Sequence, residues 1–173
     1  MKRKNWKTNS GFTLIEVIIV TAIMSIFSIF LVDLVMTTQK AWSIENTSVS
    51  VRGEAKRTLE VIAKELREGD PSAVGGVTIG GSGTSQTITF SVPNQVSQAT
   101  ILSWRQIQYA HDSVQKQVTR TVSGTTTTVG RDINSLQFSQ SNNVVTVTVG
   151  TNKLTAEGIT LQTTISSQIR MRN

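Results

Sequence analysis

The most constraining feature of this sequence is a long apolar run close to its N-terminus. Residues 12–32 contain one charged side chain, Glu16, and Asp33 marks the far end of the run. As a helix rising about 1.5 Å per residue, the run is about 31 Å long, enough to cross the hydrocarbon core of a membrane. The run therefore predicts a transmembrane helix. Because a charged side chain is unfavourable in hydrocarbon, Glu16 is expected to have a specific function.

A short basic segment precedes the apolar run. Its four basic residues are Lys2, Arg3, Lys4 and Lys7. The other 13 Lys and Arg face 11 Asp and Glu, so the net charge of +6 falls to +2 without this segment. The asymmetry predicts a cytoplasmic N-terminus with the rest of the chain outside. The basic composition is thus a topology signal, and no nucleic-acid partner is expected.

Two common membrane signals explain the N-terminus incompletely. A secretory signal peptide has a shorter apolar region followed by a small-x-small cleavage site, and no Ala-x-Ala follows this run. A plain signal anchor fits the length and the charge. It accounts neither for Glu16 nor for the abrupt polar-to-apolar junction after Ser10-Gly11.

The basic leader followed by Gly11-Phe12-Thr13-Leu14-Ile15-Glu16-Val17 resembles the class III leader of type IV pilins and pseudopilins. The resemblance implies that a prepilin peptidase cuts between Gly11 and Phe12 and that the same enzyme N-methylates Phe12. It also makes Glu16 the fifth mature residue, which in this family pairs with the terminal amine of a neighbouring subunit. From the residues alone, Thr13-x-x-Glu16 also fits a capping box, and a first-turn carboxylate suits the helix dipole. Both roles stay open.

The helical pattern continues beyond the membrane. Residues 37–68 contain no Pro, and an apolar stripe recurs at helical spacing through Leu59, Ile62, Ala63 and Leu66. The end signal is Gly69-Asp70-Pro71. One helix over about 13–68 is predicted, with residues 37–53 as its weakest part, where a bend or local melting is expected.

After Pro71 the sequence changes to short β-like runs separated by turns. Gly80-Gly81-Ser82-Gly83 is interpreted as flexible loop, and Pro93-Asn94 as a strand end. The Thr-rich segment 119–128 fits either a low-complexity stretch or an exposed hairpin, and the β propensity of Thr favours the hairpin. Six or seven antiparallel strands are expected. They are predicted over about 87–92, 101–110, 114–122, 125–129, 133–138, 145–149 and 159–171.

The resulting fold class is α+β, pilin-like, with the long helix packed on a C-terminal antiparallel sheet. The expected divisions are a cleaved leader (1–11), a transmembrane and assembly helix (12–36), an extracytoplasmic half-helix (37–68) and a β-rich domain (69–173). Removal of residues 1–36 is expected to leave a soluble, folded domain.

No catalytic or cofactor site is indicated by the sequence. The single histidine, His111, is expected in a surface turn, and Gly80-Gly81-x-Gly83 lacks the Lys-Ser/Thr of a phosphate loop. No metal or cofactor is expected, because the chain has no Cys and its acidic residues Asp70, Asp112 and Asp132 are scattered. Arg170 and Arg172 fit a solvated strand end better than a binding patch. The chain is therefore expected to be a substrate of an enzyme and not one itself.

The second half resembles, less specifically, the J-class minor pseudopilins of type II secretion and related minor pilins of pilus and competence systems. The similar positions include Leu59-x-x-Ile62-Ala63, Val118-x-Arg120 and Leu136-x-Phe138. The resemblance implies a low-abundance filament subunit near the tip that helps to start assembly. The implied partners are the prepilin peptidase, other pilin subunits, the inner membrane and the assembly platform. The first alternative is a minor pilin that acts as a tip adhesin or binds DNA or a substrate. The second alternative is an envelope protein of another kind, held by a signal anchor. Glu16 disfavours the cap subunits that characteristically lack it.

Overall fold

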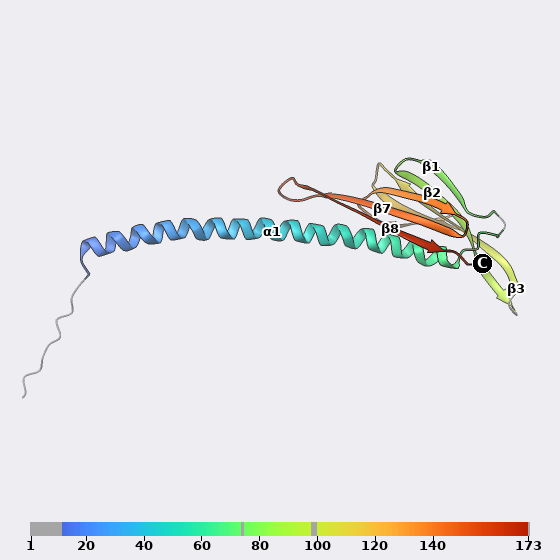
Figure 1. Ribbon diagram of the computed structural model, residues 1–173, viewed down its shortest axis with the longest axis horizontal. Helices are drawn as coiled ribbons and strands as arrows, with labels where there is room; N and C mark the ends of the chain where they lie inside the picture. Colours follow the sequence, from blue (N-terminus) through green and yellow to red (C-terminus); the bar gives the residue numbers. More distant parts are fainter. Residues whose placement is uncertain (1–11, 74, 98–99, 173) are drawn as a thin grey trace, which may run out of the picture. The chain divides into compact units, whose positions relative to one another are not determined.

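The computed structural model describes residues 12–73, 75–97 and 100–172. It divides into two compact units, Met1–Trp42 and Ser43–Asn173. The first unit contains the N-terminal part of helix α1 (Leu14–Glu68), and the second contains the rest of this helix and the whole sheet. Figure 1 shows the helix followed by the strands in chain order.

Helix α1 matches the predicted boundaries within one residue at its start, and it ends at the predicted Glu68. Of the bend or local melting expected over residues 37–53, the local melting does not occur, because these residues are helical throughout. The end of the helix is set by Gly69, whose N–H donates to the carbonyl oxygens of Glu65 (3.1 Å) and Leu66 (3.2 Å). A Cβ atom at Gly69 would lie 2.7 Å from Cε of Met171 and 2.9 Å from Cδ2 of Phe90, so a larger residue here would displace side chains of the core.

The second unit contains one sheet of eight strands with the order β5-β4-β3-β2-β6-β7-β8, and β1 pairs with β2 beside this path. The pairings are antiparallel except for a single parallel pair between β2 and β6. The strands are β1 (Thr78–Ser82), β2 (Ser85–Ser97), β3 (Thr100–Asp112), β4 (Gln117–Val122), β5 (Thr125–Gly130), β6 (Ile133–Ser141), β7 (Val144–Leu154) and β8 (Thr160–Arg170). The α+β class is thus confirmed, with one more strand than expected.

Three local predictions about the strands were wrong. Residues 80–82, interpreted as loop, belong to β1. Within this strand Gly81 adopts a positive φ of 78°, and a Cβ atom there would collide with the carbonyl oxygen of Ser85. Strand β2 does not end at Pro93-Asn94, because its pairing with β3 continues through a register shift there. Strand β4 begins at Gln117, since residues 113–116 form the turn that was expected nearer His111.

The core lies between one face of the sheet and residues 51–66 of α1, as Figure 1 shows for these parts of the second unit. The predicted helical stripe is buried, together with Ala55 and Val51. Phe90 of β2 and Tyr109 of β3 stack with ring centroids 6.3 Å apart. The sheet contributes the other large buried side chains, which are Ile88, Val92, Ile107, Val118, Ile133, Leu136, Phe138, Val145, Val147, Val149 and Ile169. Burial of this apolar area is the main stabilising term of the domain.

The other face of the sheet is covered by neutral polar side chains. On β3, Gln106 and Gln108 alternate with the buried Ile107 and Tyr109, so they lie on the face away from the core. The cross-strand partners of these residues share the face, as for Thr121, which pairs with Gln108. Hydroxyls and amides hydrogen-bond with one another across the strands, for example Thr148 with Ser166 at 3.0 Å. This alternation explains why the Thr-rich segment folds as a hairpin of β4 and β5.

The C-terminal residues are tied to the end of α1. The N–H of Arg172 donates to the carbonyl oxygen of Gly69 (3.0 Å), and the N–H of Met171 donates to that of Asn143 (2.8 Å). The side chain of Met171 is buried beside Gly69. The last residues of the sheet therefore close directly on the residue that ends the helix.

One buried hydroxyl gives a testable prediction about packing. Thr58 of α1 is fully buried, and its Oγ1 has no hydrogen-bond partner among the described residues. A Cβ at Gly130 of β5 would lie 2.2 Å from this oxygen, so the helix and the strand touch there. We expect Thr58→Val to stabilise the domain by about 1 kcal/mol, because it removes an unpaired polar atom at constant volume. Thermal unfolding checks this, and destabilisation would show that the hydroxyl is satisfied.

Candidate processing and assembly site

The N-terminal turn of α1 is closed by reciprocal bonds between Thr13 and Glu16. Oε2 of Glu16 accepts from the backbone N–H of Thr13 (2.9 Å) and from its hydroxyl (3.0 Å). In return, the N–H of Glu16 donates to Oγ1 of Thr13 (3.3 Å). This is the geometry of a capping box, in which two N–H groups at the helix start find acceptors.

Glu16 keeps capacity for a further partner. Both bonds from Thr13 end on Oε2, and within residues 12–73, 75–97 and 100–172 no group donates to Oε1. The side chain is exposed, as are its neighbours on the helix. The cap therefore orients the carboxylate and leaves one oxygen free to accept a bond from another molecule.

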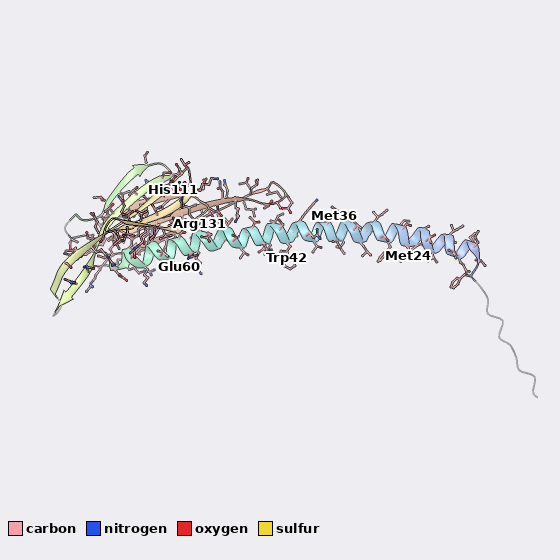
Figure 2. All side chains as sticks on the ribbon, turned by 180° about the vertical axis from the view of Figure 1, so that it is seen from behind. Met24, Met36, Trp42, Glu60, His111 and Arg131 are labelled. Atoms are coloured by element: carbon pink, nitrogen blue, oxygen red, sulfur yellow. The ribbon has the colours of Figure 1, made fainter. Side chains whose placement is uncertain are left out.

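The surface of the first unit is mostly apolar over residues 14–36, where Glu16 and Asp33 are the charged residues. Its side chains are exposed, and Figure 2 shows Met24 and Met36 projecting outward from the helix. This helix is the one in the described part of the chain that is long and apolar enough to cross a membrane. The exposed large apolar side chains in this part are Leu14, Ile15, Val17, Ile18, Ile19, Val20, Ile23, Met24, Ile26, Phe27, Ile29, Phe30, Leu31, Val32, Leu34, Val35 and Met36.

The hydroxyl side chains within this apolar part are satisfied by the helix itself. Thr21, Ser25 and Ser28 donate to carbonyl oxygens four residues earlier, at 3.0, 2.7 and 2.8 Å. In a membrane an unsatisfied hydroxyl would be costly, and this back-bonding removes the need for a partner. These residues are therefore compatible with hydrocarbon, which leaves Glu16 as the ionisable group of the span.

The structure describes only part of the predicted site. Phe12 is the first described residue, and its side chain is 86% exposed. Thr13 and Glu16 are brought together in the first turn. Gly11 and the basic residues Lys2, Arg3, Lys4 and Lys7 lie outside the described residues.

The family model of the prokaryotic N-terminal methylation motif matches residues 6–32. The chain carries a prepilin-type N-terminus. The matched residues include the junction at Gly11 and Phe12, the capping pair and the start of the apolar helix. This motif supports the class of type IV pilins and pseudopilins, a processed and methylated N-terminus, and anchoring in a membrane. None of the curated proteins and none of the solved structures compared with the chain matches it.

A second cluster of polar groups, which the sequence did not predict, joins α1 to the sheet. Glu65 receives a bidentate ion pair from Arg120 of β4, with Nε at 3.0 and 2.9 Å and Nη2 at 2.6 Å from its carboxylate oxygens. The hydroxyl of Tyr109 donates to Oε2 of the same carboxylate at 2.5 Å. The side chains of Glu65 and Arg120 are only 19% and 23% exposed. These three residues, called here the Glu65 cluster, hold the helix end on the sheet.

The electrostatics of the Glu65 cluster keep the carboxylate ionised. Burial raises the pKa of Glu65, but the bonds from Arg120 and Tyr109 outweigh burial, so the pKa lies below its ordinary value. The pKa of Tyr109 is raised, mainly by burial and secondly by the hydrogen bond to Glu65. The bond to Glu65 raises the pKa of Arg120. The sequence carried only a weak signal for this cluster, because a carboxylate and an arginine far apart in the chain do not reveal their contact.

The prediction for His111 was wrong in its position. The residue lies in β3 and is half-buried, since the turn follows Asp112. Its Nε2 lies 2.9 Å from the carbonyl oxygen of Ile133, which can only accept, so Nε2 carries the proton. Nδ1 lies 3.0 Å from the hydroxyl of Ser85 and accepts from it in the neutral ring. His111 thus joins β3 to neighbouring elements, and no ring nitrogen is left for a ligand.

The carboxylates considered for calcium have local partners instead. Asp70 accepts from the N–H of Ser72 (2.8 Å), and Asp112 accepts from the N–H of Val114 (2.9 Å). Asp132 forms an ion pair with Lys153 at 3.4 Å. Within the described ranges, no group of three or more His, Cys, Asp or Glu side chains could hold a metal ion.

Proposed function

We propose that this protein is a structural pilin or pseudopilin subunit whose leader is removed after Gly11 and whose new N-terminus, Phe12, is N-methylated. The single observation that carries the proposal is the methylation motif over residues 6–32 at the head of an exposed apolar helix. A helix that polymerises needs an apolar surface, because it first lies in lipid and then packs against the helices of neighbouring subunits. The chain is in this proposal a substrate of prepilin peptidase and has no catalytic role.

The proposed assembly contact is between Glu16 of one subunit and the Phe12 amine of the next. The free amine has an ordinary pKa near 7.7–8.0 and is cationic when protonated. Amine and carboxylate would each be unfavourable alone among apolar helices, and pairing offsets both desolvation penalties. The free Oε1 of Glu16 supports this role, since the cap on Oε2 need not be broken. Capping in the membrane and pairing in the filament are therefore compatible.

The finer assignment is a minor subunit near the filament tip, similar to the J-class pseudopilins. Its support is the resemblance of the second half, and Glu16 fits a subunit with another subunit above it. The proposed partners are prepilin peptidase, other pilin subunits and the assembly platform of the inner membrane. In this proposal the N-terminus lies in the cytoplasm, which the basic leader supports, and the β-rich domain lies outside.

A second candidate is a tip subunit that binds a surface or substrate. A depression of about 370 Å³ lies on the face of the sheet away from the core, lined among others by Trp104, Gln106 and Gln108. An aromatic side chain beside neutral amides is a common composition of ligand sites. Arg105 also lines the depression, but no second basic residue lines it among the described residues. This favours a small polar ligand over DNA, because phosphate recognition depends on clustered basic side chains.

The proposal is tested by coexpressing the full chain with a prepilin peptidase and measuring the intact mass. We expect loss of residues 1–11 together with addition of one methyl group. The matched control is Gly11→Val, which should keep the full mass because the residue before the cut is changed. An unchanged mass of the original chain would contradict the proposal.

A further inference from the structure

Both edges of the sheet are open, and both are uncharged except at Arg170, the last residue of β8. Among the described strands, β8 pairs only with β7, and β5 pairs only with β4. Residues 160–169 of β8 and 125–130 of β5 contain no charged side chain and no proline. Along such an edge every second residue directs its N–H and C=O away from the sheet, toward any strand that can pair with it.

The β8 edge is long and regular. Its pairing with β7 runs from Val144↔Arg170 to Leu154↔Thr160 without a register shift, so no bulge interrupts the edge. Natural sheets protect their edges with charges, prolines, bulges or short strands, and β8 has none of these between Thr160 and Ile169. By contrast, Arg105 and Arg120 lie on the interior strands β3 and β4. Charged side chains that would protect an edge strand are thus found on interior strands instead.

We propose that the β8 edge of one subunit pairs with the β5 edge of a second copy, so that the sheet continues from subunit to subunit. The choice of a second copy as the occupant rests on the proposed filament function and applies where two copies of this chain are neighbours, because a single tip copy would leave both edges open. The two edges fit each other because both are rich in hydroxyl side chains and because residues 160–169 of β8 and 125–130 of β5 carry no charge that pairing would bury. Because they lie at opposite ends of the sheet, their pairing is heterologous and can repeat, whereas a β8–β8 pair would close after two subunits.

The pairing predicts which side chains meet. Thr126 of β5 pairs with Thr121, and Thr121 lies with Gln108 on the face away from the core. On β8, Ser166 pairs with Thr148 and lies on this same face, because its neighbours Ile165 and Ser167 pair with buried valines of β7. When the helix-covered faces of both copies lie on the same side of the continuous sheet, each face continues across the junction, so Thr126 meets residues of β8 at even positions.

The test uses cysteine cross-linking, for which the natural chain has no competing cysteine. Full-length chains carrying Thr126→Cys are coexpressed with chains carrying one cysteine on β8 and with prepilin peptidase. We expect disulfide dimers for the even series Gln162→Cys, Thr164→Cys, Ser166→Cys and Gln168→Cys, strongest at one position. We expect none for Thr163→Cys or Ser167→Cys, because a disulfide needs Cα atoms about 4.4–6.8 Å apart and side chains on one face. This alternation separates strand pairing from general proximity.

Two matched variants complete the test. Ser139→Cys is exposed on the interior strand β6 and should give no dimer with Thr126→Cys. Thr164→Lys places an ammonium group at the edge and should remove the dimer between Thr126→Cys and Ser166→Cys, whereas Thr146→Lys on the interior strand β7 should not.

The outcomes distinguish this inference from the proposed function. An unprocessed chain would overturn the filament function itself. A processed chain whose helices cross-link through Ile23→Cys, but whose β8 and β5 do not, would overturn the edge pairing alone. Dimers between two copies of Ser166→Cys, without the mixed pair, would show a closed β8–β8 contact and would also overturn it.

Discussion

Replacing Glu16 with Ala is expected to leave the chain inserted in the membrane and processed, but unable to enter a filament. The apolar run becomes more hydrophobic without the carboxylate, so insertion should not suffer. Assembly should fail because the Phe12 amine of a neighbouring subunit would then be left among apolar helices without its counter-charge. Fractionation of membranes, followed by isolation of sheared filaments, measures the two steps separately.

Thr13→Ala is the matched control for Glu16→Ala. It removes the hydroxyl that donates to Oε2 at 3.0 Å but keeps the carboxylate and the backbone donor. If pairing with the amine is the role of Glu16, Thr13→Ala should still assemble, and Glu16→Gln should resemble Glu16→Ala because it lacks the charge. Equal loss of assembly in Thr13→Ala and Glu16→Ala, with Glu16→Gln active, would instead assign the effect to the helix cap.

The second large effect is expected at the Glu65 cluster. Arg120→Ala should destabilise the β-rich domain by about 1.5–3 kcal/mol, because it removes charge-assisted bonds and leaves a largely buried carboxylate with Tyr109. Arg120→Lys should lose less, since the charge stays but the bidentate geometry is lost. Thermal unfolding of the full chain in detergent, followed by near-ultraviolet circular dichroism, compares the variants. The exposed pair Lys56–Glu60, at 3.8 Å, is the control and should contribute little.

The same cluster predicts a dependence on pH. Because the folded pKa of Glu65 lies below its ordinary value of 4.5, the stabilisation by the carboxylate is complete above that value. It is lost as the pH falls through the lower folded value. Glu65→Gln should therefore be less stable than the natural chain at neutral pH, and the difference should shrink in acid. A difference that stays constant down to the acid transition would contradict the ionic role of Glu65.

The helix was predictable because its signals are local. An uninterrupted apolar run, the stripe of Leu59 and Ile62, and the stop at Gly69-Asp70-Pro71 each lie within a few residues, and the helix ends where they indicate. The expected melting at residues 37–53 did not occur. Ser and Thr there weaken the local preference, but Thr38 and Thr47 donate back to helix carbonyls at 2.8 and 2.9 Å.

The sheet was predictable in its alternation but not in its pairing. The glycines in β1 were interpreted as loop because their own preference is for a turn. Their strand conformation is stabilised by pairing with β2, which a local pattern does not reveal. The order of strands, with β6 beside β2 and a single parallel pair, also depends on contacts between distant residues. The Glu65 cluster and the bonds of His111 were missed for the same reason. The candidate site, in contrast, is one contiguous segment, so its pattern was visible from residues 11–17 alone.

The bonds that tie Arg172 and Met171 to Gly69 and Asn143 affect when the domain can fold. The helix end that they complete is synthesised long before the C-terminal residues that close on it. Because a chain is synthesised from its N-terminus, this domain can be completed only after residues 171 and 172 have been made. Contacts between such distant residues also slow folding, because a long loop must close first. Synthesis of residues 171 and 172, and not that of the helix, is therefore expected to limit when this domain finishes folding.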